Sequence, residues 1–294
     1  MVKKWGLRVT TLMFRVEADL HCHTTASDGL LTPQELVRQA ALAGLMGVGI
    51  TDHDTVSGWE EAEATGRECG LEILKGIELN TEVNGIEIHI LGYEPEFEAK
   101  VLQEKLSFLR GARYKRMLDM IGRLNSLDVR VRAEDVEKFA HGESIGRPHV
   151  AQALIESGYA HSLKDAFTRY IGYGAPAYVP RYKLTPAEAI KVVRQAGGVA
   201  VLAHPGIQRL EGSLKEWVDQ GLQGLEVSHS DHSGEDEARY RKLALEYGLV
   251  PTGGSDFHGE KRKPGVKLGG WGTSLDTVFV IRDLARRNRI KTTS

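Results

Sequence analysis

Short apolar runs that suit β-strands alternate with helical patterns over most of this 294-residue chain. Two of the helices between these runs begin alike, with "TPQE" at 32–35 and "TPAE" at 185–188. A threonine N-cap, a proline at the first helical position and a glutamate at the third are typical of a helix start. The alternation favours an α/β fold in which helices wind or close a parallel sheet. The predicted strands are "RVEADLH", "GVGITDH", "LEILKGIEL", "IEIHILGY", "GVAVLAH", "GLEVSH" and "LVPTGGSD".

This alternation stops between residues 98 and 182. The stretch "EAKVLQEKLSFLRGARYKRMLDMIGRLNSL" carries apolar residues at helical spacing, and the Gly- and Pro-rich "GYGAPAYVPRY" leads back to the framework. We expect a mostly helical insertion at 98–182 that contributes to substrate binding. The α/β framework is then built from residues 14–97 and 183–294.

The composition is that of a globular protein, with 41% hydrophobic and 27% charged residues. A formal net charge of −2 gives no global attraction for nucleic acid or an anionic membrane, so recognition of phosphate has to be local. Cys22 and Cys69 are too few for a disulfide framework, and the first residues make a poor signal peptide. No apolar stretch approaches the roughly 20 residues of a membrane helix. We expect a cytoplasmic protein without membrane contact, and no feature indicates an obligate protein partner.

Histidines recur in or just after the predicted strands, and acidic residues accompany them. Any single histidine of this kind is more often a core or surface residue. Eight of the eleven histidines share the placement, however, and the carboxyl ends of parallel strands meet on one face. We therefore expect these residues to be neighbours in space. They are His21, His23, His53, His89, His204, His229, His232 and His258, with the acids Asp28, Asp52, Asp54, Glu78 and Asp256.

Imidazoles combined with carboxylates suit zinc, manganese or iron rather than calcium or magnesium. His21 and His23 are two residues apart, so on an extended strand their side chains point to the same face. The number of candidate ligands exceeds the roughly four that one ion uses, which implies two or three ions. Closely spaced ions are typical of displacement at phosphorus.

The motifs "DLHCHTTASDG", "GITDHDTVSG", "GIELN", "IHILGY", "AHP" and "GSDFH" resemble, in this order, the polymerase and histidinol phosphatase (PHP) family of metal-dependent phosphoesterases. The resemblance covers nearly the whole chain. It implies a distorted (β/α)7 barrel with a trinuclear catalytic site at the carboxyl ends of the strands. The expected cofactors are two or three divalent ions, Mn²⁺ first, with Fe²⁺ or Zn²⁺ as alternatives.

The resemblance also implies which residues hold each ion. The first ion would use His21, His23, Glu78 and Asp256. The second would share Glu78 and use His89 and His204, and the third would use Asp28, His53 and His258. Some relatives have histidine where this sequence has Asp28.

Within the family, "FLRGARYKRM" and "SIGRPHVAQAL" resemble a branch that acts on nucleotides. Members remove the 3′-phosphate from nucleoside 3′,5′-bisphosphates, and some degrade short RNA from its 5′ end. The resemblance implies that a hydroxide bridging two ions attacks the 3′-phosphate of a substrate such as adenosine 3′,5′-bisphosphate. Arg110 and Arg113 share a helix face, Arg147 precedes a helix start, and all three suit a second, uncleaved phosphate. Arginines on such a helix can equally form its solvated face.

Three more residues are candidates for substrate contact. Asp54 follows the predicted ligand His53 and either orients a ligand or touches the substrate. His229 and His232, in "EVSHSDHSG", either contact the phosphate or leaving group or line the rim.

Three alternatives to the bisphosphate phosphatase stay open. A 5′-3′ exonuclease on short 5′-phosphorylated RNA uses the same chemistry and the same clamp. A histidinol-phosphatase-like enzyme needs no second phosphate site, so the arginines disfavour it. A catalytically silent metal-binding module is disfavoured by the complete set of ligands. A proofreading module associated with a polymerase is disfavoured because the sequence shows no polymerase domain.

Overall fold

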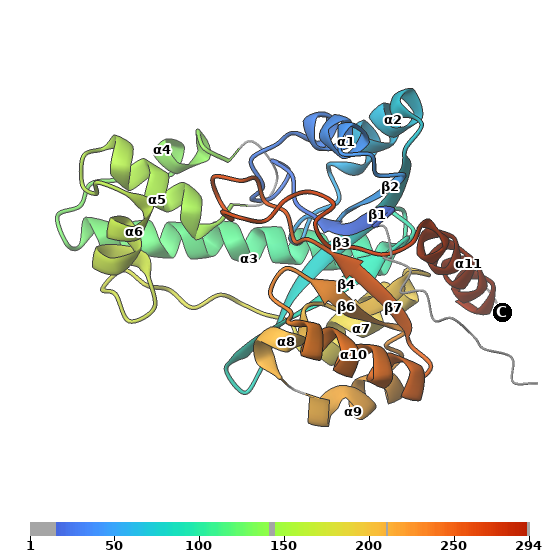
Figure 1. Cartoon of the computed structure of the whole chain (residues 1–294). Coiled ribbons are helices and arrows are strands. Elements are labelled where there is room, and N and C mark those ends of the chain that lie inside the picture. The colour runs from blue at the N-terminus through green and yellow to red at the C-terminus, as the bar shows by residue number, and fades with distance from the viewer. Residues whose placement is uncertain (1–15, 141–144, 210, 293–294) are drawn as a thin grey trace, which may run out of the picture.

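The computed structural model describes residues 16–140, 145–209 and 211–292, in which seven strands form one sheet in chain order (Figure 1). Each strand falls at one of the seven predicted runs. The predicted α/β barrel of seven strands is therefore confirmed. The strands are β1 (Ala18–Cys22), β2 (Gly47–Ile50), β3 (Glu72–Val83), β4 (Ile86–Tyr93), β5 (Val199–Leu202), β6 (Gly224–His229) and β7 (Val250–Gly254).

The sheet is not parallel throughout, as the alternation had suggested. β4 runs antiparallel to both β3 and β5, and the other neighbouring pairs are parallel. The reason is the two-residue turn Asn84–Gly85, in which both residues have positive φ, 51° and 80°. An Asn-Gly turn of this kind joins neighbouring antiparallel strands directly, without a crossover helix.

The first and last strands approach each other and nearly close the barrel. The backbone N–H of Asp256 donates to the carbonyl of His21 at 2.9 Å, and that of His23 donates to Phe257 at 2.9 Å. A Cβ on Gly254 would lie 2.3 Å from Cβ of His21. Only glycine fits there, and its absence of a side chain lets β7 deliver the residues after it to the end of β1.

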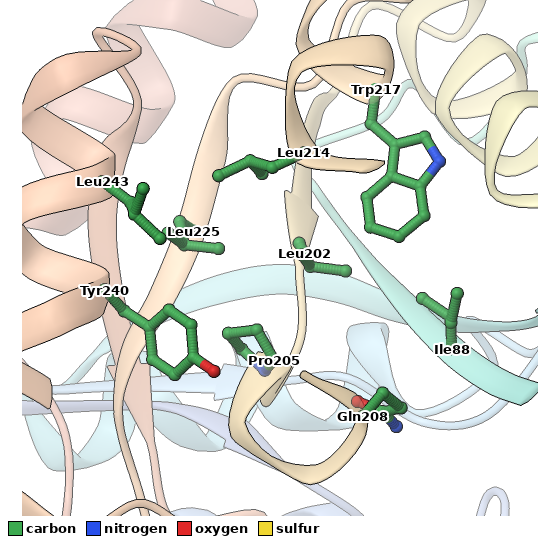
Figure 2. Close-up of a pocket in the computed structure, with 9 residues that line it drawn as sticks. All are labelled: Ile88, Leu202, Pro205, Gln208, Leu214, Trp217, Leu225, Tyr240 and Leu243. Atoms are coloured by element: carbon green, nitrogen blue, oxygen red, sulfur yellow. The ribbon is translucent and has the colours of Figure 1, made fainter. Parts of the chain in front are cut away.

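Helices cover the outside of the barrel, and the two predicted helix starts are confirmed as capping boxes at Thr32 and Thr185. Trp217 of α9 (Leu214–Asp219) and Tyr240 of α10 (Gly234–Glu246) pack over Leu202 and Leu225 of the sheet (Figure 2). The crevice between these side chains holds only about 10 Å³, so it is core packing rather than a ligand site. The covering helices are α1 (Pro33–Leu42), α2 (Trp59–Cys69), α7 (Pro186–Gln195), α8 (Pro205–Gln208), α9 (Leu214–Asp219), α10 (Gly234–Glu246) and α11 (Leu275–Thr292), with a 3-10 turn at Glu211–Ser213.

The long helix α3 (Lys100–Asn125) connects the barrel with the helices that follow (Figure 1). Leu106 and Leu109 in its first half belong to the barrel core. Met117 and Leu124 in its second half belong to a separate core. One continuous helix therefore spans both hydrophobic cores, while the predicted boundaries at 98 and 182 stay a prediction. The other elements are α4 (Ala133–Glu137), α5 (Arg147–Glu156), α6 (Leu163–Ala166) and a π-helix at Phe167–Ile171.

Both cysteines are free thiols, Cys22 buried and Cys69 exposed. Among the helices in the described ranges, none combines the length and apolar character needed to cross a bilayer.

Candidate metal centre and adjoining basic cavity

The first group of potential metal ligands lies around the end of β1. Nε2 of His21 and Nε2 of His23 lie 3.5 Å and 3.1 Å from Oε2 of Glu78. Nε2 of His23 also lies 3.2 Å from Oδ1 of Asp256. These four residues place two imidazoles and two carboxylates within the reach of one ion.

In a site built at strand ends, Glu78 would be expected just after a strand. Instead it lies inside β3. β3 is 12 residues long because it continues into the hairpin with β4. His89 likewise lies inside β4, opposite Asn80. The hairpin thus extends past the ends of the parallel strands and carries two of the site residues with it.

Three further histidines surround the carboxylate of Glu78. Nδ1 of His53 lies 3.0 Å from Oε2, and Nδ1 of His89 lies 2.6 Å from Oε1. Nε2 of His204 lies 3.3 Å from Oε1 and 3.2 Å from Nδ1 of His89. His89 and His204 therefore meet at Glu78 as the second predicted group, and His53 joins them.

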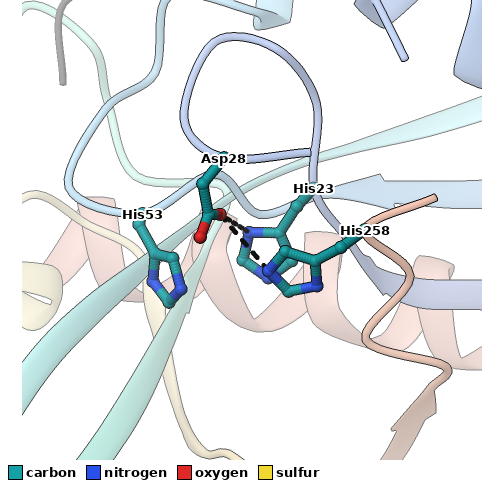
Figure 3. A group of neighbouring side chains, drawn as sticks. All are labelled: His23, Asp28, His53 and His258. Carbon is teal, nitrogen blue, oxygen red and sulfur yellow. Dashed lines mark ion pairs between the residues drawn. The ribbon is translucent and has the colours of Figure 1, made fainter. Parts of the chain in front are cut away.

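The third group contains Asp28, His53 and His258, together with His23 (Figure 3). Oδ1 of Asp28 lies 3.3 Å from Nε2 of His258 and 3.9 Å from Nδ1 of His23. The rings of His23 and His258 stack with centroids 4.0 Å apart. His23 and His53 thus each belong to two groups, and the nine predicted ligands form one continuous cluster.

Several polar atoms in this cluster are buried and have no hydrogen-bond partner within the described ranges. A buried polar atom without a partner costs free energy, and these atoms belong to residue types that ligate transition metals. The donor set therefore fits divalent ions. The atoms are Nε2 of His21, both ring nitrogens of His23, Oε2 of Glu78, Nδ1 of His204 and Nε2 of His229.

The charge states of the cluster suit this interpretation. Burial opposes the charge of Glu78, but the rings of His89 and His21 outweigh it and hold the pKa of this carboxyl well below its ordinary value. Burial lowers the pKa of His53 to about 3, which leaves a neutral ring. At His23, Asp256 and Glu78 overcome the effect of burial and raise the pKa to about 10. A bound cation would replace the proton of His23.

Glu226 supports the cluster and was missed by the sequence analysis. This buried side chain places Oε1 3.0 Å from Nδ1 of His21, while Oε2 accepts the backbone N–H of His204 at 2.7 Å. A carboxylate in this position fixes the tautomer and orientation of a ligating imidazole. The available signal was a single acidic residue within the apolar strand "GLEVSH".

Asp52 shapes the loop that presents Asp28. Its carboxylate accepts hydrogen bonds from the backbone N–H of Thr24 at 2.8 Å and from the hydroxyl of Ser27 at 2.6 Å. The chain between β1 and α1 is thereby folded back over the cluster.

His229 lies in the cluster rather than at an open rim. It is fully buried, and its Nδ1 accepts the backbone N–H of Asp231 at 3.0 Å. Its Nε2 lies 3.8 Å from Oδ2 of Asp256. With His21 and Glu226 it forms another group of potential ligand atoms.

His232 was predicted to contact the substrate or to line the rim, and the structure places its ring within the protein. Its Nδ1 donates to the carbonyl of Val227 at 2.8 Å, and its Nε2 accepts the backbone N–H of Gly206 at 3.1 Å. Both ring nitrogens are therefore used within the protein, and the residue fixes the segment after β6.

Asp54 was also predicted to touch the substrate, yet it is only 1% exposed. Its Oδ2 accepts hydrogen bonds from Nε of Arg113 at 3.0 Å and from Arg181. Burial opposes its charge, but Arg181 and Arg113 outweigh burial and lower the pKa of Asp54 well below the ordinary value. Asp54 therefore orients two arginines of the insertion and its return segment.

A polar cavity of about 260 Å³ adjoins the cluster. Asp28, His53 and His89 form one part of its wall, and aromatic side chains form another. Glu87 also lines the cavity, as do basic residues of the insertion and of its return segment: Arg113, Arg116, Arg147, Arg181 and Lys183.

The predicted Arg113 and Arg147 thus line the cavity, whereas Arg110 does not. Arg110 lies three residues earlier on α3, about 4.5 Å along the helix axis. Arg116 and Arg147 have no carboxylate partner among the described residues. Burial, and then Arg147 and Arg181, lower the pKa of Arg116 to about 10. Such a concentration of positive charge favours an anion in the cavity.

A nearly closed α/β barrel with a histidine and carboxylate cluster at one end of its strands defines a metal-dependent hydrolase. Residues 19–176 match the model of the PHP domain family. The chain belongs to this family and is a PHP-type metal-dependent phosphoesterase.

Three similar proteins cover nearly the whole chain. The 5′-3′ exoribonuclease Rnm of Escherichia coli (strain K12) is 33% identical over 87% of this chain and 89% of its own length. The 3′,5′-nucleoside bisphosphate phosphatase of Chromobacterium violaceum is 31% identical over 82% and 86%. A crystal structure assigned as a metal-dependent phosphoesterase of Bifidobacterium adolescentis is 36% identical, with a TM-score of 0.81 and coverage of 91% and 96%.

Proposed function

We propose that the protein removes the 3′-phosphate from nucleoside 3′,5′-bisphosphates such as adenosine 3′,5′-bisphosphate, with Mn²⁺ as its preferred ion. One observation carries the proposal. A single cavity has the metal-ligand candidates His53, His89 and Asp28 on one side and Arg113, Arg116, Arg147 and Arg181 on the other. A substrate that satisfies both sides carries two phosphates.

The cluster would act on the phosphate that is cleaved, and the arginines of the cavity would bind the other phosphate. Divalent ions bound by the nine ligand candidates would supply an activated water and neutralise the oxygens of the phosphate that is cleaved. Glu226 holds His21 in a fixed orientation, and Asp52 holds the loop of Asp28. The ligand atoms are therefore positioned before substrate binds.

The arginines would hold the other phosphate. Arginine suits this task because its planar guanidinium forms paired hydrogen bonds to phosphate oxygens and stays charged. Asp54 fixes Arg113 and Arg181, and Arg147 packs over the rings of Phe167 and Tyr178. A 5′-phosphate bound here would set the distance of the 3′-phosphate from the ions.

A 5′-3′ exonuclease acting on short 5′-phosphorylated RNA is the second candidate. It would use the same clamp for the terminal phosphate and cleave the first phosphodiester. The names of the relatives in Escherichia coli and Chromobacterium violaceum favour the two activities about equally, since their identities to this chain are 33% and 31%. A histidinol phosphatase would leave the arginine side of the cavity without a ligand, which disfavours it.

Phosphate release with Mn²⁺ tests the proposal. We expect the highest kcat/KM for adenosine 3′,5′-bisphosphate, with histidinol phosphate at least tenfold lower. A 5′-phosphorylated trinucleotide, analysed for release of mononucleotides, reports the exonuclease. Faster turnover of histidinol phosphate than of both nucleotides would contradict the proposal. A protein that binds metal but has no activity on any of the three would be the silent metal-binding module.

A further inference from the structure

An exposed aromatic pair extends from the basic cavity to the surface. Tyr173 lies between Gly172 and Gly174 and is 90% exposed. Its ring meets that of Tyr178 edge to face, with centroids 5.5 Å apart and an angle of 68°. A lone exposed aromatic residue is common, but this one contacts a residue of the cavity wall.

Tyr178 links Tyr173 to the proposed phosphate clamp. It lines the cavity, and the guanidinium carbon of Arg147 lies 5.8 Å from the centre of its ring. The same guanidinium lies 5.3 Å from the ring of Phe167. Positive charge for a phosphate and an aromatic face for a base therefore lie side by side.

The backbone that carries the two tyrosines is held in place. Nε of Arg116 donates to the carbonyl of Val179 at 2.8 Å, and Arg123 donates to that of Tyr178. The N–H of Ala177 donates to Tyr170 at 2.8 Å. The segment also follows a π-helix, an irregularity that is frequent at functional sites. A platform ordered before binding loses little entropy when a ligand stacks on it.

We propose that Tyr173 and Tyr178 form the base-binding subsite for the nucleotide whose 5′-phosphate contacts the arginines. This inference rests on the proposed function. The base stacks on the exposed ring of Tyr173, with the ring of Tyr178 beside it. Such stacking accepts every base, because each has an aromatic face. It favours purines over pyrimidines by their larger stacking area.

A second exposed aromatic pair provides the control. Phe108 and Tyr182 also meet edge to face, at 4.9 Å and 80°, and both are about half exposed. Neither lines the cavity. Phe108→Ala therefore removes another exposed ring without touching the proposed subsite.

The test compares adenosine 3′,5′-bisphosphate with its abasic analogue, 1-deoxyribose 3,5-bisphosphate. In Tyr173→Ala we expect KM for the adenosine substrate to rise roughly tenfold relative to KM for the abasic analogue. Its kcat stays within about twofold, because stacking acts equally on ground and transition states. Tyr173→Phe keeps the ring and the wild-type KM. An unchanged KM ratio in Tyr173→Ala, or an equal rise in Phe108→Ala, would overturn the subsite.

A binding measurement separates this inference from the proposed function. Calorimetry with adenosine 5′-monophosphate on EDTA-treated protein should show about tenfold weaker binding to Tyr173→Ala than to wild type. Wild-type protein that hydrolyses the bisphosphate while both proteins bind the monophosphate equally refutes only the subsite. Wild-type protein that neither hydrolyses the bisphosphate nor binds the monophosphate refutes both.

Discussion

At the scale of single residues, Glu78 is the centre of the site. One buried carboxylate approaches five imidazoles, which come from β1, the segments after β1 and β2, β4, and the segment after β5: His21, His23, His53, His89 and His204. Such a carboxylate can bridge ions, and each ring around it needs its other nitrogen oriented by the protein. The residues behind the ligands therefore matter nearly as much as the ligands.

The substitution Glu226→Gln tests whether this carboxylate positions the ligand candidate His21. The amide keeps the size of the side chain but loses the charge that holds Nδ1 of His21 at 3.0 Å. We expect metal affinity to fall about 10- to 100-fold, as is typical when such a partner is changed. Titration of metal-free protein with Mn²⁺ measures the affinity. Glu235→Gln, at an exposed position, is the control. Unaltered affinity in Glu226→Gln would remove its positioning role.

Arg147→Ala tests the clamp. Arg147 lines the cavity and has no carboxylate partner in the described ranges, so its charge is available to a phosphate. A hydrogen bond to a charged group contributes about 1.5–3 kcal/mol, so we expect KM for adenosine 3′,5′-bisphosphate to rise about 10- to 100-fold. Hydrolysis of a small aryl phosphate should change far less. Arg130→Ala, which removes an exposed arginine outside the cavity wall, is the matched control. Equal losses on both substrates would contradict the clamp.

The candidate ligands could be predicted because histidine is informative by type and because the family motifs fix its neighbours. The supporting residues could not. Glu226 looks like an ordinary strand residue until its distance to His21 is known. Asp54 and Arg181 are 127 residues apart in the chain, and their pairing depends on how the return segment packs. His232 follows the same pattern as the ligands, yet its hydrogen bonds are purely structural.

At the scale of elements, the β3–β4 hairpin and α3 place residues that the strand ends alone could not place. The hairpin carries Glu78 and His89 into the cluster, and α3 carries Arg113 and Arg116 to the cavity. The positions of the strands were predictable from their apolar runs. The antiparallel direction of β4 was not predicted, because the prediction rested on the alternation of strands and helices and did not use the Asn84–Gly85 turn.

Glycines inside α3 give a prediction for this element. A Cβ at Gly122 would meet no atom within 4 Å, and the helix there is exposed. Gly122→Ala should therefore raise the free energy of unfolding by about 0.5–1 kcal/mol, because alanine loses less backbone entropy on folding. Urea denaturation of the full chain measures this change.

Gly70→Ala is the contrasting variant. Its site is equally open, but Gly70 ends α2 with a φ of +66°. A side chain in that left-handed conformation costs roughly 1 kcal/mol, so this substitution should destabilise the protein. Stabilisation by both substitutions would show that open space rather than backbone conformation decides the outcome.

At the scale of the whole molecule, the site joins the first and last strands of the barrel. β1 supplies His21 and the segment after β7 supplies Asp256, and Gly254 lets the two strands approach. α11 packs Val278, Ile281 and Ala285 against the barrel interior at the amino end of β1. Closure of the barrel at the carboxyl end of β1 therefore depends on the cluster. Ions bound there would join segments from nearly the full length of the chain.

Metal binding should therefore stabilise the whole fold. An ion that binds only the folded state at 100 times its Kd contributes about 2.7 kcal/mol, which raises Tm by roughly 4 °C in a chain of this size. We expect this rise when Mn²⁺ is added to EDTA-treated protein. In Glu78→Ala the rise should nearly vanish whatever the starting Tm, because the shared carboxylate is lost. The exposed Glu104→Ala should keep the full rise. A Mn²⁺-induced rise in Glu78→Ala equal to that of wild type would mean that the ions bind elsewhere and do not close the barrel.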